Sequence, residues 1–389
     1  MKILFKHLRP VWAEVNLDKL EHNIREIKKV CGDKKIMAVI KADAYGHGAL
    51  NIAPVLLENG ADSFAVAVLS EAIELRRAGI DCPILILGFT PPSFIDDIIK
   101  YDIDQTVFSY DFAKSLSECA KRKNKIAKIH IAMDTGMGRI GYLPNEESID
   151  EIIKISELPN LKIMGAFSHF STADEMDKTY TNMQVERFNW FLNELKKREV
   201  CIGKTHIYNS AAIIDLQEGL GDQVRPGIIL YGYYPSNEVN KDIISLKPVM
   251  SLKTNVINIK KLKKGEYVGY GRKFVTKEDT MIATLPVGYA DGYSRLLTGK
   301  AKVLVKGQFA PVVGNICMDQ CMIDVSHIEN VNVGEEVTLI GEDGGNSITA
   351  EELANLIGTI SYEILCVLGK RVPRVYIKEG KVVQVRNYI

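Results

Sequence analysis

Residues 36–227 alternate between short apolar runs and longer segments with helical periodicity, and this alternation limits the possible folds more than any other feature. Eight apolar runs follow one another, at residues 36–40, 64–68, 84–88, 105–108, 127–133, 162–167, 204–209 and 223–227. Such runs are typical of buried parallel strands joined by crossover helices. Eight of them predict an α/β fold with a (β/α)8 barrel of the TIM type. An open Rossmann-like sheet is the alternative, although no G-x-G-x-x-G motif opens a helix after the first run.

The segments around these runs have the spacing of amphipathic helices. Before the first run, apolar residues recur every three or four positions between Asn16, a possible cap, and Gly32. Further helices are expected at residues 70–78, 93–101, 111–123 and 178–197. These positions place helices between successive strands, as a barrel requires.

The sequence changes character after Lys247, where strand patterns alternate with glycine-rich turns. One helical pattern interrupts them at residues 350–358, after Thr349. A chain of 389 residues also exceeds the roughly 250–300 residues at which a single core stops growing. We therefore expect a barrel over residues 11–240 and a mostly-β domain over residues 241–389, with the attachment of residues 1–10 to the second domain left open.

Charge and cysteine content narrow the class of ligand and the compartment. Lys plus Arg and Asp plus Glu both number 49, and no long block of one sign occurs, which argues against nucleic acid or an anionic membrane as a partner. The seven cysteines lack metal-ligand spacing and fit free thiols in a reducing compartment. No apolar run reaches the length of a membrane span. We expect a cytoplasmic protein without a metal, acting on a small molecule.

A single lysine ends the first apolar run, in the sequence IMAVIKADAYGHG. The ammonium group of Lys41 is costly to keep beside a buried strand unless a site holds it. A partly desolvated lysine has a lowered pKa and can form a Schiff base with an aldehyde. The alternative is a lysine whose head reaches back to solvent.

Polar motifs follow the later strands, and all strand ends of a barrel that carry such loops meet at one rim. The motifs are DTGMGR at 134–139, SHF at 168–170, NSA at 209–211 and RPGI at 225–228. Loops after the last two strands are the usual phosphate site of this architecture, and here they supply Ser210 and Gly227. A phosphate-bearing ligand is implied, although singly these residues could be a helix cap and a turn glycine.

A lysine at a barrel rim opposite a phosphate cradle is the arrangement that holds pyridoxal phosphate as an internal aldimine. At this point the sequence resembles the alanine racemases, whose motifs it matches in order. These are VIKADAYGHG, MDTGMGRIG, FSHFSTADE, YNSAA, VRPGIILYG, VGYGR, PVGYADGYSR, GNICMDQ and KRVPR. The resemblance covers nearly the whole chain. It implies an enzyme that uses pyridoxal 5'-phosphate to interconvert L- and D-alanine for peptidoglycan, as a homodimer with shared active sites.

The resemblance also implies the roles of the main residues. Lys41 would bind the cofactor and act as the base on one face, and Tyr270 of the partner subunit would act on the other. Two opposed bases suit the inversion of a stereocentre. Arg139 would contact the phenolate and the substrate carboxylate. Arg225 would face the pyridine nitrogen, where a permanently charged group keeps that nitrogen unprotonated.

Further roles follow from the same resemblance. It implies cofactor contacts by Tyr45, His169, Ser210, Gly227 and Ile228, carboxylate binding by the backbone N–H of Met318, and an entrance lined by Asp174, Tyr289, Arg295 and Asp319.

Three positions depart from the family pattern. Ala132 stands where many members have a lysine, often carbamylated, that orients the arginine, so we expect another acceptor, a water or an anion such as chloride beside Arg139. Lys370 stands where some members have a tyrosine, and Tyr208 replaces a residue that is usually small. Serine, lysine and ornithine therefore stay open as substrates. A pyridoxal phosphate carrier and a decarboxylase are further alternatives, against which Tyr270 and Arg225 argue.

Overall fold

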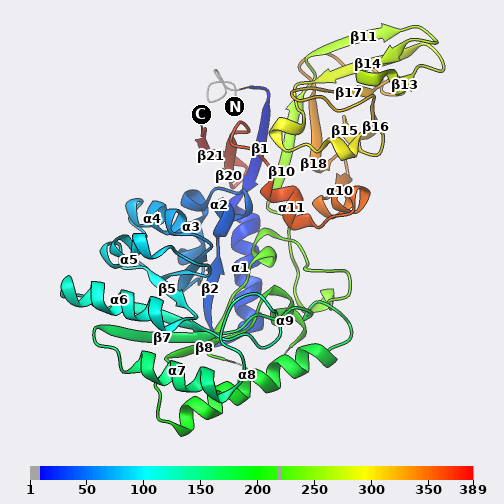
Figure 1. Ribbon diagram of the computed structural model, residues 1–389. Helices are drawn as coiled ribbons and strands as arrows, with labels where there is room; N and C mark the ends of the chain where they lie inside the picture. Colours follow the sequence, from blue (N-terminus) through cyan, green and yellow to red (C-terminus); the bar gives the residue numbers. More distant parts are fainter. Residues whose placement is uncertain (1–8, 217–220, 389) are drawn as a thin grey trace. The chain divides into compact units, whose positions relative to one another are not determined.

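The structure, a computed structural model, describes residues 9–216 and 221–388. All eight apolar runs form parallel strands, and β2, β5, β7 and β8 are labelled in Figure 1. Their spatial order is β8-β7-β6-β5-β4-β3-β2-β9. Their bounds are β2 Lys35–Val39, β3 Ser63–Val66, β4 Ile84–Ile86, β5 Asp104–Val107, β6 Ala127–Ala132, β7 Leu161–Phe167, β8 Lys204–His206 and β9 Gln223–Val224. The N–H of Asp222 donates to the C=O of Thr205 (2.8 Å), and that of Arg225 to the C=O of Tyr208 (2.9 Å). These bonds join the two outer strands and nearly close the ring, so the predicted barrel is confirmed.

Helices follow most of the strands, as the periodicity predicted. They are α1 Leu17–Cys31, α3 Ala49–Glu58, α4 Leu69–Arg77, α5 Ile95–Lys100, α6 Tyr110–Arg122, α7 Glu146–Ser156, α8 Thr179–Lys197 and α9 Ser210–Asp215, with short 3-10 turns η1 Pro92–Phe94, η2 Ile228–Tyr231 and η3 Lys241–Ile243. Asn16 caps α1, since its Oδ1 accepts from the N–H of Lys19 at 2.9 Å. Leu20, Ile24 and Ile27 of this helix are fully buried. The apolar stripe of α1 therefore forms part of the core.

The second part of the chain is a mostly antiparallel sheet of eleven strands, in the order β11-β14-β17-β16-β15-β18-β10-β1-β20-β21 with β19 on β18. Its strands are β1 Val11–Asn16, β10 Met250–Asn255, β11 Asn258–Leu262, β14 Thr280–Leu285, β15 Lys302–Val305, β16 Gln308–Val313, β17 Cys321–Asp324, β18 Glu336–Asp343, β19 Asn346–Ile348, β20 Arg374–Lys378 and β21 Lys381–Arg386. A separate pair is β12 Tyr267–Val268 with β13 Phe274–Val275. The predicted mostly-β domain is confirmed.

Two helices, not one, interrupt this sheet: α10 Ala350–Ile357 and α11 Ser361–Cys366. Thr349 caps α10 through a hydrogen bond from the N–H of Glu352 to its hydroxyl (3.1 Å). The second helix has six residues, too few for its apolar spacing to stand out in the sequence. Three 3-10 turns also occur here, η4 Tyr270–Arg272, η5 Tyr289–Asp291 and η6 Arg295–Leu297.

The chain divides into two compact units. The barrel unit contains Leu20–Ala44 and Ala49–Lys247, and the β unit contains Tyr45–Gly48, the residues from Pro248 onward and those up to Lys19. Residues 11–19, which the sequence assigns to the barrel, group with the β unit because β1 pairs with β10 and β20. The segment Tyr45–Gly48 joins it because the side chains of Arg374 and Tyr376 donate to the carbonyls of Gly46 (2.8 Å) and His47 (3.0 Å).

Candidate active site

Lys41 begins a left-handed turn at the end of β2, drawn as α2 (Lys41–Tyr45) in Figure 1. The four residues after Lys41 all have φ between 51° and 57°. A left-handed conformation costs about 1–2 kcal/mol for each residue with a side chain, so four in succession mark a strained segment. Glu71 of α4 holds the turn by accepting a hydrogen bond from the N–H of Ala42 at 2.6 Å. Backbone strain of this kind is concentrated at functional sites, which supports a role for Lys41.

Arg225 lies just beyond β9 and is only 4% exposed. Its Nη1 donates to the C=O of His206 (2.6 Å) and to Nδ1 of the same residue (2.8 Å). Its Nη2 donates to the C=O of Ser168 (2.7 Å) and to Nδ1 of His169 (3.2 Å). Arg225 and His169, for both of which the sequence implies contact with the cofactor, are thus hydrogen-bonded to each other. The end of the barrel thus fixes the guanidinium group from several sides.

A chain of buried polar groups continues from Arg225 into the barrel. Nε2 of His206 lies 2.9 Å from Nδ1 of His130, and Nε2 of His130 lies 3.4 Å from Oδ2 of Asp104. Because a guanidinium group can only donate, Nδ1 of His206 accepts and its Nε2 carries the proton. His206 then donates from Nε2 to Nδ1 of His130, so the proton of His130 is on its Nε2 and is donated to Asp104. These histidines were not predicted as site residues, because their only sign in the sequence is a polar residue inside an apolar run.

Positive charge dominates the rim around His169. Burial, followed by the charges of Arg225, Arg139 and Lys41, lowers the pKa of His169 to about 3. Burial and the charge of Arg139 lower the pKa of Arg225 to about 9, so its guanidinium group stays charged at neutral pH. All three groups that act on His169 are cations, and they come from loops after three different strands. This rim suits a ligand that carries negative charge, such as a phosphate ester.

Ser210 and Gly227 lie together, as the sequence predicted for a phosphate site. The N–H of Gly227 donates to the Ser210 hydroxyl at 2.9 Å. Ser210 is not the cap of α9, because Oδ1 of Asn209 accepts from the N–H of Ala212 at 3.0 Å and performs that role. The Ser210 hydroxyl proton is not used in this bond and can be donated. Ile228, the third predicted residue, begins η2 directly after Gly227.

Gln184 of α8 connects the loops that carry Arg139 and His169. It is fully buried. Its Nε2 donates to the C=O of His169 (3.0 Å) and to the hydroxyl of Thr135 (3.3 Å), and its Oε1 accepts from the N–H of Ser171 (3.0 Å). The sequence analysis missed Gln184, because a glutamine within a helical pattern carries no distinct sign of such a role.

Arg139 itself is exposed, and within residues 9–216 and 221–388 its side chain has no hydrogen bond or ion pair. Ala132 is buried at the end of β6 and offers no polar group. The additional acceptor expected beside Arg139 stays a prediction. Asp174, a predicted entrance residue, is half-buried on a barrel loop, where its C=O accepts from the Ser236 hydroxyl at 2.6 Å.

Tyr208 belongs to a different region of the barrel unit. It is 2% exposed, and its ring lies 5.6 Å from the Lys34 ammonium group. With Cys31 of α1 and Ile213 of α9 it lines a cavity of about 320 Å³. The effect on substrate selectivity that the sequence suggests for Tyr208 stays a prediction.

The remaining predicted residues belong to the β unit. Tyr270 is 72% exposed at the start of η4, beside a groove of about 630 Å³ that Tyr267 and Met322 also line. Nδ2 of Asn315 donates to the C=O of Tyr270 at 2.6 Å and holds its backbone. Tyr45 is buried with its ring 6.0 Å from that of Tyr362, and burial raises its pKa, so its hydroxyl stays neutral.

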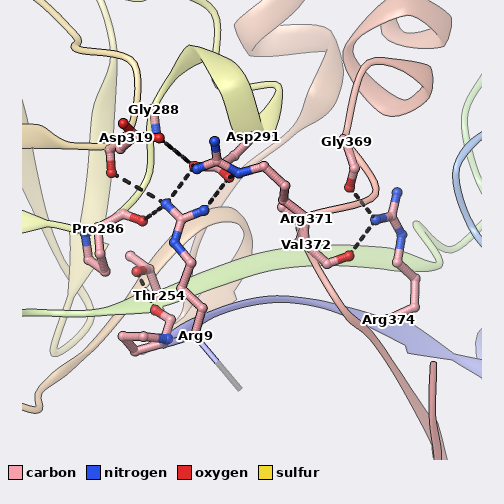
Figure 2. A network of polar contacts seen from close by, with 11 residues as sticks. Arg9, Thr254, Pro286, Gly288, Asp291, Asp319, Gly369, Arg371, Val372 and Arg374 are labelled. Atoms are coloured by element: carbon pink, nitrogen blue, oxygen red, sulfur yellow. Dashed lines mark hydrogen bonds and ion pairs between the residues drawn. The ribbon is translucent and has the colours of Figure 1, made fainter. Parts of the chain in front are cut away.

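Met318 and the predicted entrance residues of the β unit lie on turns. Met318, Tyr289 and Arg295 are exposed, the last two at the starts of η5 and η6. The Asp319 carboxylate pairs with Arg371 at 2.7 Å, within a cluster of arginines and aspartates (Figure 2). The sequence analysis did not find this cluster, whose members are far apart in the chain.

In the part of the chain that the structure describes, none of the helices could span a bilayer. In the same residues, no group of three or more histidine, cysteine, aspartate or glutamate side chains is placed to hold a metal ion.

The barrel and the β domain each match a domain model of the same family. Residues 15–235 match the family model for the alanine racemase N-terminal domain, and residues 249–376 match the model for its C-terminal domain. Over 387 residues the chain is 62% identical to the alanine racemase of Clostridium tetani, with 99% of this chain and 100% of that protein covered. The chain belongs to the alanine racemase family.

Solved structures agree with this assignment. The alanine racemase of Clostridium difficile 630 has a TM-score of 0.94 and 45% identity, covering 98% of this chain and 99% of that one. The histidine racemase of Leuconostoc mesenteroides subsp. sake has a TM-score of 0.88 and 32% identity, covering 95% of this chain and 98% of that one. The same fold therefore occurs in a racemase named for a different amino acid.

Proposed function

We propose that this protein is an alanine racemase that interconverts L- and D-alanine with pyridoxal 5'-phosphate as its cofactor. The observation that carries the proposal is the set of three cations, Lys41, Arg139 and Arg225, around a neutral His169 at the barrel rim. The full-length similarity to alanine racemases supports the choice of substrate. We infer that the D-alanine is used for peptidoglycan; a cytoplasmic location stays a prediction.

The residues of the rim fit the proposed cofactor. Lys41 would bind it covalently through its amine, and Arg225 and His169 would contact its ring. The Ser210 hydroxyl and the backbone at Gly227 and Ile228 would hold the phosphate, with the neutral Tyr45 hydroxyl as a further donor. When bound, pyridoxal phosphate supplies an electron-withdrawing ring that makes the α proton of an amino acid removable.

Two side chains would move the α proton. The Lys41 amine would take or return it on one face, and the phenol of Tyr270 of the partner subunit would do so on the other. Arg139 and the N–H of Met318 would hold the substrate carboxylate. Asp174, Tyr289, Arg295 and Asp319 would line the entrance.

Arg225 would set the electronic character of the cofactor ring. Its guanidinium group stays charged near neutral pH and can only donate a hydrogen bond to the ring nitrogen. The nitrogen then stays unprotonated and withdraws less charge than a protonated one would. A proton removed from the substrate would therefore be returned quickly, which favours racemisation over side reactions.

The test is a chiral assay of purified protein with pyridoxal phosphate and L-alanine. We expect D-alanine to accumulate to equal amounts of the two enantiomers. Lys41→Ala should lose the absorbance band of lysine-bound cofactor and lower turnover by about a thousandfold or more. Lys154→Ala, at an exposed position of α7, is the matched control and should keep both. Full racemisation by Lys41→Ala would refute the proposal.

A racemase of other or several amino acids is the second candidate. Lys370 is exposed between Gly369 and Arg371, where some members of the family have a tyrosine, and the fold is shared with a histidine racemase. A turnover panel of alanine, serine, lysine, ornithine and histidine separates the two candidates. Similar kcat/KM values for small and large side chains would contradict selectivity for alanine.

A further inference from the structure

Asp291 is a buried carboxylate in the β unit, only 1% exposed, and it binds two arginines (Figure 2). Its Oδ2 accepts from Nη2 of Arg9 (2.8 Å) and from the N–H of Gly288 (3.0 Å). Its Oδ1 accepts from Nη1 of Arg9 and lies 3.3 Å from Nε of Arg371. Two cations would leave this buried group with excess positive charge, but Asp319 supplies a second negative charge. Removing one partner of a buried ion pair destabilises a protein, because the other charge is left unpaired. The four side chains of this cluster therefore depend on one another.

The cluster joins four segments of the β unit. Arg9 donates to the C=O of Pro286 and to that of Asp319 (3.3 Å). Arg371 donates to the Asp319 carboxylate at 2.7 Å. The segment before β1, the turn after β14, the loop before β17 and the loop after α11 are therefore fixed to one another. Two of these loops carry Tyr289 and Met318, and a third carries Lys370.

The backbone of the Asp291 turn lies directly against the Met318 loop. The N–H of Tyr289 donates to the C=O of Cys317 (3.1 Å), and the N–H of Ala290 donates to the C=O of Met318 (3.0 Å). A Cβ added to Gly288 would lie 2.3 Å from the Cys317 oxygen. There is no free space between the two segments, so a shift of the turn must displace the Met318 loop.

Because a peptide group is planar, the contact between the Asp291 turn and the Met318 loop also fixes the direction of the Met318 N–H. The C=O of Cys317 and the N–H of Met318 belong to the same planar trans peptide, in which they point in opposite directions. The bond from Tyr289 to that C=O therefore sets the direction of the Met318 N–H. The Met318 side chain is 52% exposed and gives the peptide little support of its own.

We propose that Asp291, held by Arg9 and Arg371, is a positioning residue that aims the Met318 N–H at the carboxylate of the substrate. This inference rests on the proposed function, in which that N–H binds the carboxylate. Loss of the Asp291 charge should release the turn, rotate the Cys317–Met318 peptide and weaken carboxylate binding. The proton transfer itself should change little, because Asp291 does not touch the reacting atoms.

The test compares Asp291→Asn with the natural protein as dimeric holoenzyme. We expect the KM for alanine to rise about tenfold while kcat stays within about twofold, which is the signature of lost uniform binding. Propionate, which is alanine without its amino group, should bind about tenfold more weakly. Ethylamine, which is alanine without its carboxylate, should bind unchanged.

Further variants separate positioning from general stability. Gly288→Ala leaves the four charges intact but displaces the Met318 loop, and it should reproduce the effects on KM and propionate. Arg371→Lys should restore part of the affinity that Arg371→Met loses. Asp324→Asn, which changes a carboxylate bound to Ser326 on the same unit, should leave KM unchanged.

Two results would overturn the inference. If Asp291→Asn and Gly288→Ala both lower the melting temperature but leave KM and propionate binding unchanged, the cluster is structural only. Equal losses of propionate and ethylamine would also contradict it, because the effect would not be specific to the carboxylate. If the natural protein fails to racemise alanine, the proposed function fails, which the first assay shows independently.

Discussion

Arg225 carries its charge inside the barrel with no carboxylate in direct contact, among the residues that the structure describes. Its guanidinium group donates to carbonyl oxygens and to the His206 imidazole, and the His130 imidazole connects His206 to Asp104. Each imidazole accepts at one nitrogen and donates at the other, which requires the neutral form. Burial and the charge of Arg225 accordingly lower the pKa of His206 well below its ordinary value.

This lowered pKa predicts a pH-dependent stability. Below about pH 6.5 the unfolded chain binds a proton at His206 that the folded chain does not, so stability should fall as the pH decreases. The slope for one such group is about 1.4 kcal/mol per pH unit. Urea unfolding at pH 7, 6 and 5 should show a shallower slope for His206→Asn than for the natural protein. His327→Asn, at an exposed histidine of the β unit, should keep the natural slope, and an unchanged slope in His206→Asn would contradict the argument.

At the scale of elements, the strands of the barrel were predictable because each is a run of apolar residues that the barrel buries. Lys41 was predictable for the same reason, since a charge at the end of such a run is conspicuous. The arginine cluster was not, because Arg9 and Asp291 are 282 residues apart and only the fold brings them together. The left-handed turn after Lys41 was not predictable either, because its alanines have no preference for that conformation.

Helix α8 supports the rim loops through the side chain of Gln184, so replacing this residue should affect both stability and turnover. Gln184→Leu removes the donor to the C=O of His169 and to the hydroxyl of Thr135. Leaving buried polar groups unpaired should lower the free energy of unfolding by about 2–3 kcal/mol and reduce turnover, because both rim loops lose their support. Asn189→Leu, on the exposed face of the same helix, should change stability by less than about 0.5 kcal/mol.

Denaturant unfolding and turnover measured on the same samples would test the role of α8. Equal stabilities for the two leucine variants would show that Gln184 is an ordinary helix residue. A loss of stability without any loss of turnover would show that the rim loops keep their arrangement without it.

At the scale of the whole molecule, the proposed function requires two copies of the chain for each active site. Tyr270 is 72% exposed in the β unit, where a second copy could receive it, and Lys41 is on the barrel unit. A symmetric dimer would then hold two equivalent sites, each with Lys41 from one protomer and Tyr270 of the partner subunit.

Hybrid dimers give this arrangement a quantitative test. Lys41→Ala and Tyr270→Phe should each be nearly inactive as homodimers. When the two variants are co-expressed and associate at random, half of the dimers are hybrids, and each hybrid has one intact site and one doubly altered site. The mixture should therefore recover about a quarter of the natural activity per dimer. If both bases came from the same protomer, every site would lack one of them, and the mixture would stay as inactive as its components.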